Sequence, residues 1–146
     1  MAGQARDARA VRPGRYRLLA VLAWAAVAGC SMNPATGQKE LNLVSESQEI
    51  AMGLQAAQQV AAQMGGYTDT AWQGYVSRLG LQLAAKSERP QLPWSFTVVD
   101  DPQVNAFALP GGPIYITRGI LANMNSEAEL AGVLGHEIGH VTARHS

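Results

Sequence analysis

Near its carboxyl end the chain carries two histidines four residues apart, with a glutamate directly after the first: His136, Glu137 and His140. On an α-helix, residues with this spacing lie about 40° apart around the axis and one turn apart along it. Two such imidazoles can bind one metal ion at about 2.0–2.1 Å, the distance typical of zinc. A neighbouring glutamate can take a proton from the water that the ion activates. The pattern therefore predicts a zinc-dependent hydrolytic site with ligands His136 and His140 and general base Glu137.

This chemistry requires a helix, and the preceding residues predict one. Ser126 followed by Glu129 is a capping-box pattern, so the helix is expected to begin at Glu127 and to run almost to the end of the chain. At 100° per residue, one side of this helix collects a stripe of apolar residues that we expect to be buried: Leu130, Leu134, Ile138 and Val141. The histidines lie on a different face. The alternative is a pair of surface histidines beside a solvated glutamate.

Two other side chains near the pair are not expected to bind the same ion. His145 lies about 140° around a continuous helix from His140, and Glu129 lies roughly 10 Å along the axis from His136. We interpret His145 as a surface or supporting polar group and Glu129 as a capping residue. A catalytic zinc ion normally has three protein ligands and a water.

The same helix contains a strip of three glycines, Gly132, Gly135 and Gly139. Each glycine inside a helix costs about 0.8–1.0 kcal/mol relative to alanine. Three such residues on one strip suggest that another backbone packs closely there, from a strand or from a downstream helix.

Two scaffold helices are predicted earlier in the chain. The first is expected to start at Ser45, with Gln48 completing a capping box, and to end at Gly65. Its apolar stripe is Ile50, Leu54, Ala57, Ala61 and Met64. The second is expected to start at Asp69 and to end before Pro90, with Trp72, Val76, Leu79 and Leu83 along one face.

Three short strands are predicted between these helices and the histidine helix. Residues 94–99 are rich in aromatic and β-branched side chains, and two shorter pieces follow at 106–109 and 114–117. The two shorter pieces are separated by Pro110, two glycines and Pro113, which suit a tight connection. The fold class is therefore α+β.

The first 29 residues have the features of a secretory signal. Five arginines precede an uncharged stretch at 18–28, which is too short to span a bilayer comfortably. The exit, Val-Ala-Gly followed by Cys30, resembles the lipobox of bacterial lipoproteins, which implies lipidation of Cys30. An ordinary signal peptide with an incidental cysteine is the alternative. We assign 1–29 as signal peptide, 30–43 as tether and 44–146 as the amino-terminal part of the zinc-dependent hydrolytic domain.

Charge and cysteine content exclude other classes. From Cys30 onward the chain has six basic and ten acidic side chains, a balance of about −4, and no basic cluster. Nucleic-acid binding is therefore not expected. Because Cys30 is the only cysteine, an internal disulfide cannot form.

Three ordered segments resemble metallopeptidase family forty-eight, the HtpX-like and Oma-like gluzincins, and in particular its BepA-like bacterial lipoprotein branch. They are N-P-A-T-G-Q-K-E-L-N-L-V-S-E-S-Q-E-I-A-M-G, V-N-A-F-A-L-P-G-G-P-I-Y-I-T-R-G and H-E-I-G-H-V-T-A-R-H. The resemblance implies the amino-terminal part of a zincin-like fold and a zinc endopeptidase that degrades misfolded or unassembled envelope proteins. It also implies that Asn105, Ala106 and Phe107 bind substrate at an edge of the sheet.

The resemblance further implies a third zinc ligand, a glutamate on a helix downstream of the histidine motif. No residue of this sequence matches it, so the sequence is a fragment or an early-terminated reading frame, or another chain supplies the rest. We favour the fragment, which is expected to bind zinc weakly and to be inactive by itself. The alternative function is a non-enzymatic, membrane-tethered module that binds outer-membrane clients. In either case Ser31, directly after Cys30, implies sorting to the outer membrane, facing the periplasm.

Overall fold

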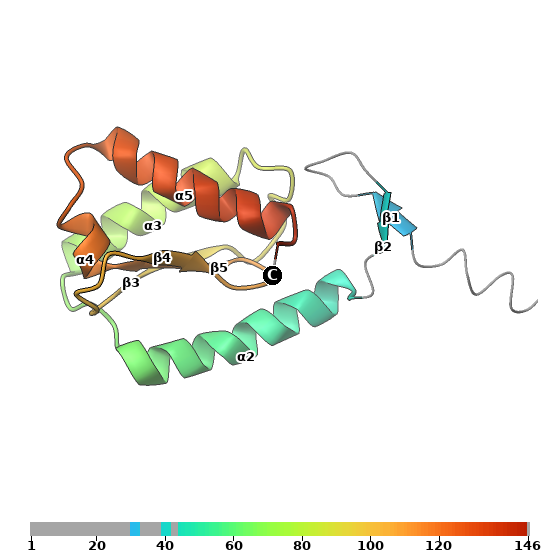
Figure 1. The fold of residues 1–146 in the computed structure, drawn as a ribbon, viewed down its shortest axis with the longest axis horizontal. Coiled ribbons are helices and arrows are strands. Elements are labelled where there is room, and N and C mark those ends of the chain that lie inside the picture. Colours follow the sequence, from blue (N-terminus) through green and yellow to red (C-terminus); the bar gives the residue numbers. More distant parts are fainter. Residues whose placement is uncertain (1–29, 33–38, 42–43, 146) are drawn as a thin grey trace, which may run out of the picture.

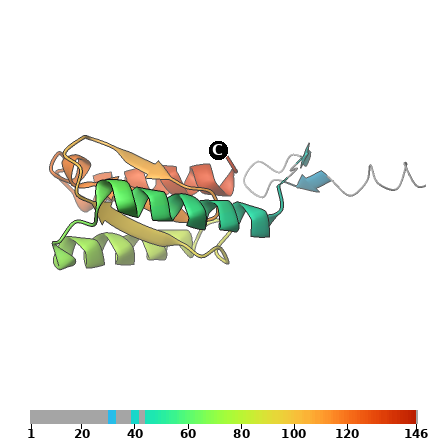
Figure 2. The ribbon, with the colours of Figure 1, turned by 90° about the horizontal axis from the view of Figure 1, so that it is seen from below.

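The computed structural model describes residues 30–32, 39–41 and 44–145. Its main body has three layers (Figures 1 and 2). Helices α3 (Thr70–Ala84) and α5 (Glu127–Thr142) cover one face of a small sheet, and helix α2 (Glu46–Met64) lies on the other. The one-turn helix α4 (Arg118–Leu121) joins the sheet to the segment that leads into α5. The expected α+β class is confirmed.

The sheet consists of β3 (Ser95–Val99), β4 (Ala106–Ala108) and β5 (Pro113–Thr117), in the order β3-β5-β4. Strand β5 is central and buried along its whole length. It runs parallel to β3 and antiparallel to β4. The turn between β4 and β5 contains Gly111 at φ 77° and Gly112 at φ 127°, a backbone region that side chains rarely adopt. These two glycines therefore permit the tight connection predicted from the sequence.

The predicted helix starts are confirmed. Ser45 caps α2 in a reciprocal capping box with Gln48, and the Asp69 carboxylate accepts hydrogen bonds at the start of α3. Ser126 accepts from the amide of Glu129 at the start of α5. The Glu129 side chain, however, accepts from the amide of Asn125 rather than from that of the cap residue. Glu129 therefore does cap the start of α5 as predicted, but its carboxylate binds the amide of Asn125, one residue before the cap residue.

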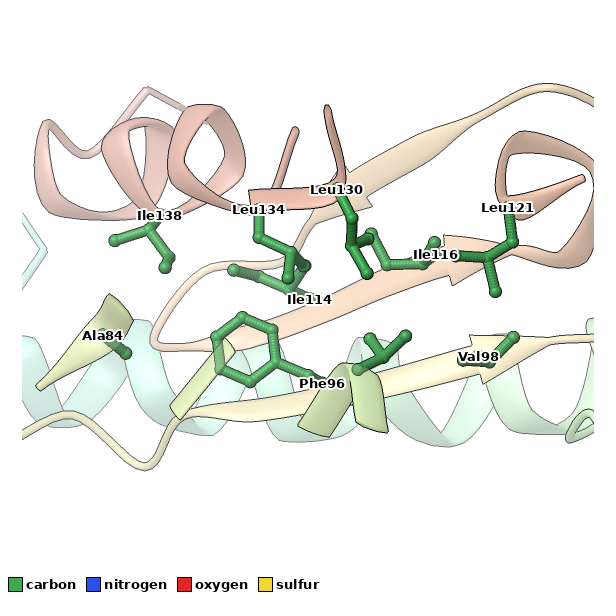
Figure 3. Packing of buried hydrophobic residues seen from close by; sticks show 10 residues of the cluster. Ala84, Phe96, Val98, Ile114, Ile116, Leu121, Leu130, Leu134 and Ile138 are labelled. Atoms are coloured by element: carbon green, nitrogen blue, oxygen red, sulfur yellow. The ribbon is translucent and has the colours of Figure 1, made fainter. Parts of the chain in front are cut away.

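The core lies between α3, α5 and the sheet (Figure 3). The predicted stripe of α5 is buried in it, with Leu130, Leu134 and Ile138 facing Ile114 and Phe96. Helix α3 approaches β3 closely at Gly80, where an added Cβ would lie 2.4 Å from the Phe96 ring. Glycine at this position therefore permits the close packing of helix on sheet.

The predicted apolar stripe of α2 is not the buried face of that helix. Leu54 is 56% exposed, whereas the buried residues are Glu49 and Gly53. A Cβ on Gly53 would lie 1.8 Å from the carbonyl oxygen of Pro110, so α2 contacts the β4–β5 turn through its smallest residue. Periodicity identified the helix but not this contact, because it cannot distinguish packing against a backbone turn from packing against an apolar layer.

The two edges of the sheet differ. Along β3, the Gln73 side chain donates to Phe96 O and accepts from Val98 N, both at 2.9 Å, and Tyr67 N donates to Val98 O. These contacts occupy backbone groups that another strand could otherwise use. Strand β4 pairs only with β5 within the described part of the chain. Its outer edge is therefore the open one.

The predicted signal peptide, residues 1–29, lies outside the described residues. The predicted tether was expected to be a loop. It contains instead a short antiparallel pair, β1 (Cys30–Met32) with β2 (Lys39–Leu41). Backbone pairing of this kind needs no apolar pattern and leaves little signal in the sequence. None of the helices in the described segments is long and apolar enough to cross a membrane.

Candidate active site

Helix α5 brings the two predicted ligands together. The Nε2 atoms of His136 and His140 lie 3.0 Å apart. The rings meet edge to face, with centroids 4.5 Å apart and planes at 88°. Both imidazoles thus direct the same ring nitrogen toward one point beside the helix.

The pair fits a zinc ion. Two ligand atoms of a tetrahedral zinc site lie about 3.3 Å apart, because each is about 2.0–2.1 Å from the ion. The observed 3.0 Å separation differs from this value by only a few tenths of an ångström. The two nitrogens are also within hydrogen-bond distance of each other, and the tautomers of the rings decide which one donates. Metal binding through Nε2 requires each ring to be in the neutral tautomer that carries its proton on Nδ1.

Glu137 is nine-tenths buried, with an exposed fraction of 9%. No hydrogen bond or ion pair joins its carboxylate to any residue that the structure describes. None of the buried side-chain oxygens in the described structure lacks a hydrogen-bond partner, so the carboxylate end of this residue is open to solvent at the depression that it lines. The Glu137 side chain is therefore held mostly within the fold, with its carboxylate available to a molecule in the depression.

A depression between α5 and the sheet edge contains this carboxylate. Its lining includes Glu137 and His136 from α5, together with Asn105 and Ala106 from the sheet edge. Strand β4 approaches α5 directly, so the predicted substrate-binding segment and the predicted general base share one open surface. Two of the three predicted substrate-binding residues therefore lie beside His136 and Glu137.

Thr117, at the end of β5, holds this edge segment in place. It is fully buried, and its hydroxyl lies 2.6 Å from Gln103 O and 2.8 Å from Asn105 O. The same oxygen accepts from the amide of Asn105 at 3.1 Å and caps α4 through the amide of Ile120. A single threonine thus fixes the entrance to β4.

Phe107 lies apart from the other two predicted substrate-binding residues. Its ring stacks on Tyr115 with centroids 5.2 Å apart, whereas Ala106 and Ala108 pack against the core between α5 and the sheet. Because side chains alternate along a strand, Phe107 points to the opposite face of the sheet, which α2 covers. Its side chain is therefore not part of the depression.

The hydrogen-bond register identifies the open backbone groups of β4. Leu109 N donates to Pro113 O, and Thr117 N donates to Asn105 O. The backbone N–H and C=O groups of the odd-numbered residues of this segment therefore point toward β5. Antiparallel pairing alternates, and Phe107 opposite Tyr115 belongs to the same set. The N–H and C=O groups of Ala106 and Ala108 therefore point outward, toward the free edge.

His145 does not converge with the histidine pair. Helix α5 ends at Thr142, earlier than predicted, and Arg144 adopts φ 55°, which turns the chain out of the helix. The exposed His145 ring lies 5.6 Å from the His140 ring, centroid to centroid. Across the described residues, no group of three or more His, Cys, Asp or Glu side chains could hold a metal ion. The described residues therefore provide two convergent metal ligands, His136 and His140.

The glycine strip of α5 has no close neighbour in the described structure. A Cβ added at Gly132, Gly135 or Gly139 would meet nothing within 4 Å outside the helix's own backbone. The strand that we considered as its packing partner is therefore not one of the described strands.

Sequence reasoning missed a buried charge cluster at the carboxyl end of α5. It centres on Glu49 of α2 and Arg89, which follows α3, with exposed fractions of 6% and 2%. One signal was available: Glu49 lies four residues before Gly53, the residue at which α2 packs on the turn. Its partner could not be found, because Arg89 lies 40 residues away along the chain.

An α+β fold with two convergent histidines, a buried glutamate between them and an open strand edge defines a metallopeptidase-type site. Residues 70–146 match the profile of Peptidase family M48. The chain is 37% identical over 118 residues to the mitochondrial metalloendopeptidase OMA1 of Schizosaccharomyces pombe, covering 77% of this chain and 34% of that protein. It is 36% identical over 112 residues to the beta-barrel assembly-enhancing protease of Yersinia pestis, covering 77% and 23%.

The chain belongs to Peptidase family M48, a family of metalloendopeptidases. The resemblance inferred from the three sequence motifs is confirmed. The chain spans about a third or less of the length of these relatives.

Proposed function

We propose that this chain provides the zinc-binding helix and the substrate-binding edge of an envelope endopeptidase. His136 and His140 bind Zn²⁺, and Glu137 is the general base. The substrates are misfolded or unassembled envelope polypeptides. The observation that carries the proposal is the position of Glu137, which lines the same depression as His136, next to two convergent imidazole nitrogens.

The substrate is proposed to bind as an added strand. An extended polypeptide can pair with the outward N–H and C=O groups of Ala106 and Ala108, which form the free edge of β4. This pairing uses main-chain atoms and therefore accepts many sequences, as degradation of misfolded proteins requires. Asn105 and Ala106 bring the bound chain next to Glu137.

In hydrolysis, Glu137 accepts a proton from the attacking water and returns it to the amine released when the peptide C–N bond breaks. Zinc, when bound, supplies Lewis acidity that polarises the substrate carbonyl and makes the water more acidic. The third protein ligand is proposed to be a glutamate outside the present sequence.

The proposed location is the periplasmic face of the bacterial outer membrane. A lipid on Cys30, added after recognition of the signal at 1–29, would anchor the protein, with residues 30–43 as the tether and 44–146 as the domain. Stable anchoring needs more than one acyl chain, because a single chain binds a membrane only marginally. Mass spectrometry of the membrane-bound chain tests this proposal: a mature form starting at an acylated Cys30 supports it, and an unmodified Cys30 contradicts it.

A second candidate is a tethered module that binds unfolded clients without cutting them. The open edge of β4 favours it, because strand addition requires no metal, and only two ligands converge in the described chain. The test is zinc content and casein cleavage by the purified chain beside Glu137→Gln. Zinc-dependent cleavage that the Gln variant loses supports the enzyme. Casein binding with no zinc binding at all supports the module, whereas absent cleavage alone does not distinguish the two, because the fragment is expected to be inactive by itself.

A further inference from the structure

We propose that Glu49 and Arg89 form a positioning clamp, which fixes the last turn of α5 and thereby the ring of His140 relative to strand β4. The consequence for metal binding rests on the proposed function. The clamp itself is defined by contacts among α2, the segment after α3, the β4–β5 turn and α5.

The two residues form a bidentate pair. Arg89 donates from Nη1 to Glu49 Oε1 and from Nη2 to Glu49 Oε2, each at 2.9 Å. Nη2 also donates to Glu46 Oε2 at 3.0 Å. A planar guanidinium on a carboxylate in this geometry restricts both orientation and distance, which a lysine at the same place could not do.

The pair holds two further segments of backbone. Arg89 Nη1 lies 3.2 Å from the carbonyl oxygen of Val141, the residue after His140, and donates to it. The amide of Gly111, in the β4–β5 turn, donates to Glu49 Oε1 at 3.2 Å. One buried ion pair thus links the end of the histidine helix to the turn that ends the substrate-binding strand.

Arg144 adds a second connection from the end of α5. Its Nε lies 3.4 Å from Glu49 Oε2, directly after the helix has ended. Carbonyl oxygens in the last turn of a helix lack intrahelical partners, and cations near them are favourable. Arg89 therefore contacts the last turn of α5 directly, through Val141 O, and Arg144 joins the residues after that turn to Glu49.

The geometry around His140 indicates what the clamp controls. A cavity of about 130 Å³ beside the pair is lined by His140, Glu49 and Ala108, among other residues. The cavity thus separates the metal-binding ring from the outward-facing backbone of β4. Its width depends on the distance between the end of α5 and the β4–β5 turn, which the clamp spans.

A buried ion pair is weak support for a purely stabilising function, because apolar residues of similar volume often replace such pairs without loss of stability. The same replacement removes the specific contacts to Val141 and Gly111. Apolar replacement of both residues therefore tests the positioning of the last turn of α5 while the stability of the fold is largely kept.

The test uses the whole chain in three forms beside the wild type. Glu49→Leu combined with Arg89→Met removes both charges of the clamp together, so neither member of the pair is left buried without the other. Glu49→Gln is the milder variant, which keeps the shape of the side chain but loses the bidentate pair. Arg118→Met is the matched control, because Arg118 forms an exposed ion pair with Asp100 away from α5.

Two quantities are measured: amide hydrogen exchange along α5 and β5, and zinc affinity by competition with a chromogenic chelator. We expect exchange in residues 139–143 to accelerate at least tenfold in the double variant and less in Glu49→Gln, with β5 unchanged. Zinc affinity should fall by about 10–100-fold, the range seen when the groups that orient metal ligands are lost. Arg118→Met should match the wild type in both measurements.

Uniformly faster exchange in α5 and β5, or no change in residues 139–143, would overturn the clamp. A local change in exchange with unaltered zinc affinity would overturn its link to His140. If the wild type and His136→Ala bind zinc equally poorly, the proposed function fails, and the exchange pattern still decides whether the clamp exists.

Discussion

Nε2 of His136 lies 3.0 Å from Nε2 of His140, although the two residues are a full helical turn apart. This convergence is a property of one helix face and needs no other element to create it. The pair can therefore bind metal only when both rings are present and neutral.

His140→Ala should weaken zinc binding by the chain at least tenfold, because it removes one of two convergent ligand atoms. His145→Ala is the matched control: its ring lies near His140 but is exposed and does not point to the pair. Chelator competition at neutral pH measures both affinities. Equal losses in the two variants would show that His145 is a ligand and that our assignment is wrong.

Glu137→Met should stabilise the fold by about 1 kcal/mol, since it places an apolar side chain of similar length at a residue that is only 9% exposed. The expected gain reflects the general conflict between activity and stability at reactive sites. Chemical denaturation at neutral pH measures it. Glu88→Met, at an exposed position, should change stability by less than about 0.5 kcal/mol. A destabilised Glu137→Met protein would indicate that the carboxylate has a structural function.

Two glycine-to-alanine changes in helices should have opposite effects. Gly80→Ala places a Cβ within 2.4 Å of the Phe96 ring and should destabilise the chain by about 1–3 kcal/mol. Gly135→Ala meets no neighbour within 4 Å and should stabilise it by up to about 1 kcal/mol through helix propensity. Thermal unfolding distinguishes the two. Destabilisation by Gly135→Ala would show that another segment packs on the glycine strip after all.

Ala108→Pro should weaken the binding of an extended polypeptide without unfolding the sheet. The register directs the Ala108 N–H toward the free edge, where proline is tolerated in strands. Phe107→Pro, the control, removes an N–H that faces β5 and should destabilise the fold. Binding of fluorescently labelled casein and thermal unfolding are measured for both. Unchanged casein binding by a folded Ala108→Pro protein would exclude this edge as the binding site.

Stability should decline at alkaline pH partly because of Tyr115. Burial raises the pKa of its phenol above the ordinary value of about 10. The unfolded chain therefore loses this proton at lower pH than the folded chain does. The stabilising contribution is complete below about pH 10 and is lost as the pH rises toward the folded-state pKa.

Tyr115→Phe should reduce the decline above pH 10 while leaving stability at pH 7 nearly unchanged. The reduction is partial, because the hydrogen bond to Glu127 also raises the pKa of Tyr75. Urea unfolding at pH 7 and at pH 10.5 measures the difference. Parallel losses in the wild type and in Tyr115→Phe would contradict a contribution from Tyr115.

The sequence alone determined those features that depend on neighbours within one or two helical turns. The caps at Ser45, Asp69 and Ser126, the buried stripe of α5 and the convergence of His136 with His140 all follow from local spacing. The glycines of the β4–β5 turn belong to the same group, because their positive φ values are a local requirement. These predictions were accurate because such interactions recur wherever the local pattern does.

The tertiary structure decided which groups meet across long separations. It pairs Glu49 with Arg89, buries Gly53 rather than Leu54, and turns Phe107 away from Glu137. It also blocks the β3 edge with Gln73 and leaves the β4 edge open. None of these outcomes follows from periodicity, which reports only that a residue is apolar or polar on one face. Which segment covers that face depends on the packing of the whole chain. A helix face can be covered by a backbone turn or by a buried ion pair as well as by apolar side chains.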